Sequence, residues 1–224
     1  MFSALAGGHV EDIGHLLDVG ADINETDRDG RTPLYVASQE GRAALAALLL
    51  DRGADVDKAD KDGWTSLLLA SEQGHATVAE LLLARGADVD KAKQSGTTPL
   101  YMASQNGHAA LVKLLLDRGA DVDKAQEDGA TALFVASQQG HAAIAALLLD
   151  CSADVDKAKQ SGTANFNSAT SGGSTPLQIA RERGHKDVAW LIHGHIRAYM
   201  LDCFRATLPS ELIEFVTAFA FAGH

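Results

Sequence analysis

Hydrophobic and polar positions in the stretch from residue 93 to residue 125 predict two short helices. Thr98 can cap a helix whose first residue is Pro99, because the N–H that proline lacks is not used in the first helical turn. The positions that follow at i, i+3 and i+4 are small or apolar, and they form a narrow face that a neighbouring helix can approach closely. These positions are Leu100, Ala103 and Ser104. Gly107 ends the first predicted helix.

A second helix is predicted from about Ala109, because apolar residues cover most of its circumference. Those residues are Leu111, Val112, Leu114, Leu115 and Leu116. Gly119 ends this helix at a left-handed position. The run Ala-Asp-Val-Asp-Lys at 120–124 is too polar and too short for a third helix. We therefore expect it to turn the chain outward towards the next β-turn.

Neither predicted helix can be stable by itself. Each is about eight to ten residues long, below the roughly 12–15 residues that an isolated helix needs in water. Their apolar faces must be covered on both sides by copies of the same unit. The pattern therefore predicts a solenoid, in which each unit contacts its neighbours in sequence.

The whole chain supports this prediction, because the same unit recurs with a period of 33 residues. Thr32, Thr65, Thr98 and Thr131 follow this spacing, and glycines at 8, 41, 74, 107 and 140 keep the same step. Nearly identical segments of the type LLLDRGADVDKA occupy 48–59, 81–92, 114–125 and 147–158. This internal duplication indicates one elongated array.

The repeated unit resembles the ankyrin repeat, whose signature T-P-L-H-x-A opens a β-turn and a pair of helices. Thr-Pro-Leu occurs at 32–34, 98–100 and 175–177, and the resemblance covers residues 1 to about 200. It implies a family that binds other proteins. The signature His is replaced at every unit, by Tyr35, Leu68, Tyr101, Phe134 and Gln178. We therefore expect the Thr-to-His hydrogen bond of the motif to be absent and packing to replace it.

The predicted fold class is all-α: an ankyrin-repeat α-solenoid of about six stacked helix-turn-helix units, with projecting β-turns and a C-terminal helical cap. The array spans 1–200, and residues 201–224 form the apolar cap. Units are expected at 1–26, 27–59, 60–92, 93–125, 126–158 and 159–200. The first unit lacks a leading turn and is more polar on its second helix, as a terminal repeat requires.

The junction between the fifth and sixth units is the weakest point that the sequence predicts. The sixth unit carries an inserted loop at 164–174, which is small, polar and rich in Gly and Ser. Ser152 stands where the other units have a helix-ending glycine, and a left-handed Ser costs roughly 1 kcal/mol relative to Gly.

The end of the chain changes character. The last array helix begins at Lys186 and runs on past the point where glycine stops the others. Residues 208–224 then start with Leu-Pro-Ser-Glu and become very apolar. We interpret this segment as a cap that folds over the exposed face of the last repeat. The alternative is a docking helix, because the segment resembles the opening of an F-box, which ties substrate adaptors to ubiquitin ligases.

Charge and composition exclude several classes of partner. A formal net charge of -11 and few clustered basic residues argue against nucleic-acid binding. Cys151 and Cys203 are too few for a disulfide framework. No signal peptide or membrane span is evident in the sequence. We expect a monomeric, soluble protein in the cytoplasm, and the same reasoning leaves a nuclear location open.

No stretch combines a nucleophile with a base, a phosphate-binding glycine loop or a ligand cluster at coordination spacing. We therefore expect no enzyme activity, no cofactor and no metal. The one group that could hold zinc is His185, His193, His195 and Cys203, and an enzymatic hypothesis depends on it. His193 and His195 would lie about 200° apart on a continuous helix, which argues against this site. The acidic turn at Asp57, Asp60 and Asp62 lacks calcium-loop spacing.

Units differ at their turn tips and along the exposed side of the first helix, which is where an ankyrin solenoid would meet its partner. Trp64 on a projecting turn is typical of an interface anchor. With the residues at the signature position it would form an aromatic patch on the concave face. The predicted protein-binding residues are Arg31, Tyr35, Trp64, Leu68, Thr97, Tyr101, Gln105 and Phe134.

The opposite rim repeats Asp-Val-Asp-Lys at 55–58, 88–91, 121–124 and 154–157. We interpret this acidic stripe as a solvated edge that would favour a basic partner. The function predicted from the sequence is a non-catalytic module that binds a protein through its concave face and turn tips. The alternative is a substrate adaptor in which 208–224 recruits a ubiquitin ligase or other machinery.

Overall fold

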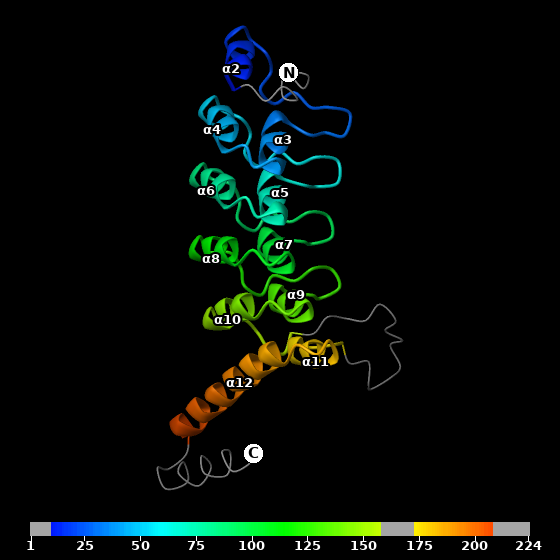
Figure 1. The fold of residues 1–224 in the computed structure, drawn as a ribbon, viewed down its shortest axis with the longest axis vertical. Coiled ribbons are helices and arrows are strands. Elements are labelled where there is room, and N and C mark those ends of the chain that lie inside the picture. Colours follow the sequence, from blue (N-terminus) through cyan, green and yellow to red (C-terminus); the bar gives the residue numbers. More distant parts are fainter. Residues whose placement is uncertain (1–9, 158–172, 208–224) are drawn as a thin grey trace.

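The computed structural model describes residues 10–157 and 173–207, with side chains described as far as Met200. In these ranges the chain forms eleven α-helices, which alternate between two rows (Figure 1). The first helices of the units are α3 (Pro33–Gln39), α5 (Ser66–Gln73), α7 (Pro99–Gln105), α9 (Ala132–Gln139) and α11 (Pro176–Glu182). The second helices are α2 (Val10–Asp18), α4 (Ala43–Asp51), α6 (Ala76–Ala84), α8 (Ala109–Asp117), α10 (Ala142–Asp150) and α12 (Lys186–Thr207).

Each row is a stack in which every helix packs against the equivalent helix of the next unit. The connecting turns project to one side, beyond the row of first helices (Figure 1). The all-α solenoid predicted from the sequence is therefore confirmed. The first helix of unit 1 and the inserted loop from 164 to 172 lie outside the described residues.

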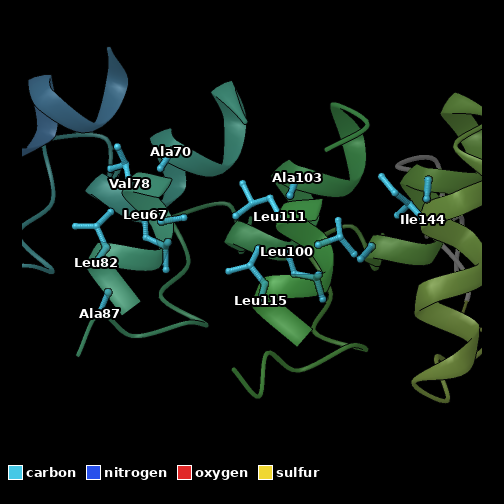
Figure 2. Close-up of a cluster of buried hydrophobic side chains, with 14 of the residues drawn as sticks. Leu67, Ala70, Val78, Leu82, Ala87, Leu100, Ala103, Leu111, Leu115 and Ile144 are labelled. Carbon is cyan, nitrogen blue, oxygen red and sulfur yellow. The ribbon is translucent and has the colours of Figure 1, made fainter. Parts of the chain in front are cut away.

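One hydrophobic core runs between the two rows along the described length of the array. Figure 2 shows how it is built: Leu67 and Leu100 from the first helices meet Leu82 and Leu115 from the second helices of the same units. Small residues such as Ala70 allow the rows to approach closely. Because each core layer is shared between neighbouring units, no unit could keep its apolar surface dry alone.

The threonine at the start of each first helix caps it through its side chain. The Oγ1 atom of Thr32 accepts a hydrogen bond of 3.1 Å from the backbone N–H of Tyr35. The same bond occurs in units 3 to 6. The helix cap predicted for Thr98 is therefore confirmed and recurs in the other units. The cap uses the backbone N–H of the residue at that position, so any side chain there preserves it.

The repeated Gly-His pair joins neighbouring units. The Nε2 atom of His108 lies 3.0 Å from the carbonyl oxygen of Glu72, one unit earlier. A carbonyl only accepts, so the ring carries its proton on Nε2. The rings of His75, His141 and His185 make the same contact one unit apart. These histidines therefore hold a structural position between units.

The Asp-Val-Asp-Lys loops also connect units, which corrects their interpretation as a merely solvated edge. The carboxylate of Asp123 accepts a 2.8 Å bond from the backbone N–H of Asp154 in the next unit. Lys157 Nζ reaches back to the carbonyl oxygen of Asp123, at 2.6 Å. Equivalent bonds recur at Asp57 and Asp90. The stripe is therefore a ladder that fixes the stacking register.

The last unit differs from the others in its second helix. α12 runs without a break through Gly194. It also continues past residue 200, the predicted end of the array. Ser152, which precedes this unit, has a φ of 64°. In the described part of the chain, every other residue with a positive φ is a glycine. The predicted left-handed Ser is thus confirmed. Residues 208–224, which carry the predicted cap or docking helix, lie outside the described residues.

Candidate protein-binding surface

The projecting turns are closed by a shared set of hydrogen bonds. In unit 3 the backbone N–H of Asp60 donates to the carbonyl oxygen of Trp64 at 3.0 Å. The carboxylate of Asp60 accepts from the N–H groups of Asp62 and Trp64, at 3.0 and 2.8 Å. Asp27 occupies the equivalent place in unit 2 and accepts from Asp29 and Arg31. Because a side chain at the base ties down each of these turns, their tips have defined positions.

Neighbouring tips are joined to one another through the backbone. The N–H of Lys61 donates to the carbonyl oxygen of Asp29, at 3.2 Å, and that of Glu127 donates to Ser95, also at 3.2 Å. These bonds pair the tips of units 2 and 3 and those of units 4 and 5. We call the surface formed by residues 27–31, 60–64, 93–97 and 126–130 the turn ribbon.

Exposed side chains on the turn ribbon differ from unit to unit. Arg28 and Lys61 give the first two tips a basic residue, whereas Gln94 and Glu127 take the equivalent places in the next two. Polar residues at the ends of the first helices lie beside them. The exposed ones are Gln39, Glu40, Gln73, Asn106 and Gln139. The side chain at this one position of the tip thus changes from basic through neutral to acidic, while the exposed carboxylates of Asp29 and Asp62 stand beside Arg28 and Lys61.

Trp64 lies half-buried at the inner edge of the turn ribbon. Its ring packs against a second hydrophobic cluster, and the Nζ atom of Lys93 sits 4.3 Å from the ring centroid. An ammonium group over an indole face is attracted by the negative face of the ring. The pair links the turns of units 3 and 4, so Trp64 is both a packing residue and a partly accessible one.

The aromatic patch predicted on the concave face is instead a small core. Leu68, Tyr101 and Phe134 form the second hydrophobic cluster with Met102, Ala130, Val135 and Ile179. Leu68 is 0% exposed and Phe134 is 2% exposed. Residues of neighbouring units pack around these positions, which is why they do not reach the surface. The prediction that these residues lie together is thus confirmed, whereas the prediction that they lie on the surface was wrong.

Tyr35 is also buried, and its hydroxyl group donates a 3.0 Å hydrogen bond to Oδ2 of Asp60 in the next unit. Burial, and then the bond to Asp60, raise the pKa of the Tyr35 phenol well above its usual value. Burial likewise raises the pKa of Tyr101. These phenols therefore serve as neutral packing groups between units.

The other three predicted residues have separate surroundings. Arg31 is partly exposed and forms a 2.7 Å ion pair with Asp27, whose pKa is lowered by the hydrogen bond from Arg31. Thr97 is buried, and its hydroxyl group bonds to Ser95 and Gln126 within the ribbon. The Gln105 side chain is half-buried at the end of α7.

Sequence reasoning missed the residues that tie the units together across the ribbon. Asp60 is one, because it bonds its own turn and the preceding Tyr35. Gln126 is another, because its amide donates to Thr97 at 2.9 Å. A signal existed for Asp60: an Asp that opens a glycine-containing turn commonly accepts a hydrogen bond from the backbone N–H two residues on. No sequence signal indicated the bonds between units.

The alternative metal sites find no support in the described residues. Nowhere in this part of the chain do three His, Cys, Asp or Glu side chains gather as they would around a metal ion. The ring of His185 is engaged by the carbonyl oxygen of Gln138, at 3.1 Å. α12 has no break at Gly194, so His193 and His195 point to different sides. The Cys203 side chain lies outside the description.

No helix in the described part of the chain is both long enough and apolar enough to span a bilayer. Comparison with curated proteins gave no match for this chain. A family model described as ankyrin repeats (3 copies) matches residues 1–93 and again 85–159. These matches together cover well over half of the sequence, and the helix pairs and turns described above agree with them. The chain therefore belongs to the ankyrin-repeat family, whose members are generally protein-interaction modules and typically not enzymes.

Proposed function

We propose that this array binds another protein along the turn ribbon and the adjoining ends of the first helices, without a cofactor. One observation carries the proposal. The residues that join the units through the histidine and Asp-Val-Asp-Lys contacts repeat with little change, whereas the exposed side chain at the tip is Arg28, Lys61, Gln94 and Glu127 in successive units. A rigid frame that presents unit-specific side chains suits recognition of one extended surface.

The direct contacts in this proposal come from exposed residues. Arg28, Lys61, Gln94 and Glu127 project from successive tips, and Trp64 supplies partly accessible aromatic surface beside Lys93. Aromatic and basic residues commonly carry much of the energy of protein interfaces. Tyr35, Leu68, Tyr101 and Phe134 act behind this surface, by holding the turns in place.

The change of charge along the ribbon suggests the polarity of the partner. The exposed side chains of Arg28 and Lys61 would face acidic groups of the partner, and that of Glu127 would face a basic group. Such complementarity chiefly sets orientation and the association rate. Binding should therefore weaken when salt screens these charges.

A capture experiment with two matched variants tests the proposal. The first carries Lys61→Glu and Gln94→Glu on the ribbon, and the second carries Thr77→Glu and Ala110→Glu, which are exposed on α6 and α8. Immobilised protein is incubated with cell extract, and bound proteins are quantified by mass spectrometry. We expect the ribbon variant to lose at least ~10-fold of a specific partner, about 1.4 kcal/mol, while the helix variant retains it.

Equal capture by both variants would contradict the ribbon as the binding surface. Thermal melts of both variants serve as the control for folding. All four substitutions are at exposed positions, so the melts should agree with wild type to within the usual effect of surface changes.

A further inference from the structure

A hollow lies where α12 leaves the array, between this helix and the loop that follows α10. Its volume is about 570 Å³, many times the roughly 30 Å³ of one water molecule, so it has room for several side chains. The loop residues 152–156 form one wall, and residues of the second half of α12 form the other. The apolar part of the lining consists of Ala153, Val155, Ile196, Ala198, Tyr199 and Met200.

In the inner units, the loop after each second helix is bonded to the equivalent loop of the next unit. The carboxylates of Asp57, Asp90 and Asp123 each accept the backbone N–H of an aspartate one unit later. In unit 6 the chain does not form this loop. α12 continues as a helix where α10 ended at Asp150, and it projects past α10 (Figure 1).

The apolar stripe of α12 that packs on the array continues into the hollow. Val188 and Ile192 are fully buried against the core. Ile196 and Tyr199 follow at four and seven residues beyond Ile192, on the same side of the helix. Tyr199 is nevertheless 67% exposed. The apolar stripe of α12 therefore extends beyond the core, and its last part around Tyr199 is not covered by described residues.

The side of the last unit that faces away from unit 5 avoids exposed apolar surface in another way. Its outward side, which a seventh unit would have covered, is polar at three positions where unit 5 has buried residues. Gln178 replaces Phe134, Arg181 replaces Ser137 and His193 replaces Leu149. Polar replacement of this kind makes a terminal repeat soluble without a cover. Apart from Trp190, the exposed large apolar side chains of this unit, Tyr199 and Met200, line the hollow.

We propose that residues 208–224 of the same chain fill this hollow, rather than lying over the outward side of the last repeat. The segment is strongly apolar, with Leu212, Ile213, Phe215, Val216, Phe219 and Phe221. It follows Thr207, and the helix between Met200 and Thr207 spans only about 10 Å at 1.5 Å per residue. An extended chain advances about 3.3 Å per residue, so the segment is long enough to return to Tyr199.

Hydrogen–deuterium exchange of the full-length protein, read by mass spectrometry, tests this proposal. The two variants are Tyr199→Asp in the hollow and Trp190→Asp as the matched control. Trp190 is 74% exposed, and it lies about 180° from Tyr199 around the helix. In wild type, the amides of 208–224 should exchange at least ~10-fold more slowly than in a free peptide. Tyr199→Asp should remove this protection, and Trp190→Asp should leave it unchanged.

Three results would overturn the proposal. Exchange of 208–224 at free-peptide rates in wild type would show that the segment covers nothing. Loss of protection in Trp190→Asp but not in Tyr199→Asp would place it on the other side of α12. Protection that increases with protein concentration would indicate a second copy as the occupant. Circular dichroism of both variants establishes that the array itself is intact, so each result bears on the hollow alone.

Discussion

At the scale of single residues, contacts with the next unit restrict which residue fits at some positions, and Gly74 is an example. The ring of His108 packs directly over Gly74, and a Cβ built on that glycine would lie 2.6 Å from it. Gly86 also has a positive φ, but nothing lies within 4 Å of a Cβ built there. Comparing substitutions at the two glycines therefore separates the cost of the positive φ, which both share, from the cost of displacing the His108 ring, which applies only to Gly74.

We predict that Gly74→Ala destabilises the array more than Gly86→Ala. Both changes place alanine in the left-handed region, which costs roughly 1–2 kcal/mol. Gly74→Ala also displaces the His108 ring from its hydrogen bond to Glu72, worth about 0.5–1.5 kcal/mol. Urea unfolding of the two variants measures the difference, and equal midpoints would rule out a role for the histidine contact.

Tyr35 makes a residue-scale prediction about alkaline pH. The folded-state pKa of Tyr35 is raised, first by burial and then by Asp60, above the unfolded value of about 10. Its stabilisation is therefore complete below pH ~10 and is lost as the pH rises through the folded pKa, because the unfolded state releases the proton first. Tyr35→Phe should be less stable than wild type at pH 8, by about 1 kcal/mol for the lost bond.

That difference between Tyr35→Phe and wild type should shrink when urea unfolding is repeated at pH 10.5. Other groups that ionise in this range are present in both proteins and cancel in the comparison. A difference that stays constant between the two pH values would mean that Tyr35 does not couple folding to ionisation.

At the scale of structural elements, hydrogen bonds between loops add to the packing of the helices in fixing how the units stack. Asn24 occupies in the first described loop the place that Asp57 takes in the next, and its side chain accepts the N–H of Asp55 at 2.9 Å. An amide can thus replace the carboxylate in this ladder. Burial raises the pKa of the Asp57 carboxyl, while the N–H of Asp88 partly opposes that shift.

We predict that Asp57→Asn stabilises the array at neutral pH, because it keeps the bond to Asp88 and removes a charge from a partly buried site. A raised folded-state pKa means that protonated Asp57 favours the folded state. This contribution is present below about pH 4 and is lost as the pH rises through the folded-state pKa. The advantage of the Asn variant should therefore increase from pH 3 to pH 6, as measured by thermal melts.

A companion change provides the control for the ladder. Asp57→Ala removes the acceptor as well as the charge and should cost about 1 kcal/mol at neutral pH. If both variants melt together, the bond between the loops does not contribute to stability.

Ser152 gives a second prediction at this scale. Its φ of 64° is unfavourable for a residue with a Cβ, so Ser152→Gly should raise the free energy of unfolding by about 1 kcal/mol. Ser152→Ala retains the Cβ and should give no such gain. Chemical denaturation compares the three proteins, and a Gly variant no more stable than wild type would exclude strain at this junction.

The sequence predicted the helices well and the contacts between units poorly. Thr98, Pro99 and Gly107 are local signals, and α7 begins at Pro99 and ends at Gln105. The bond of Tyr35 to Asp60 and the burial of Phe134 depend instead on how the residues of the neighbouring units pack against the first helix. A pattern read along one unit contains no information about that cover.

At the scale of the whole molecule, the array is a frame with two distinct edges. One edge is the ladder of Asp and Lys residues, which repeats and fixes the register. The other is the turn ribbon, whose exposed residues vary from Arg28 to Glu127. The edge at which the units differ was predicted from the sequence. Leu68 and Tyr101 were also predicted to be exposed there, but both are buried.

If the turn ribbon is where this protein meets its partner, binding should protect its backbone amides. Hydrogen–deuterium exchange of the array, alone and saturated with a captured partner, measures this protection. We expect slower exchange on binding at 27–31, 60–64, 93–97 and 126–130, with little change in the second helices α4, α6 and α8. Protection confined to those second helices, with unchanged exchange along the ribbon, would contradict it.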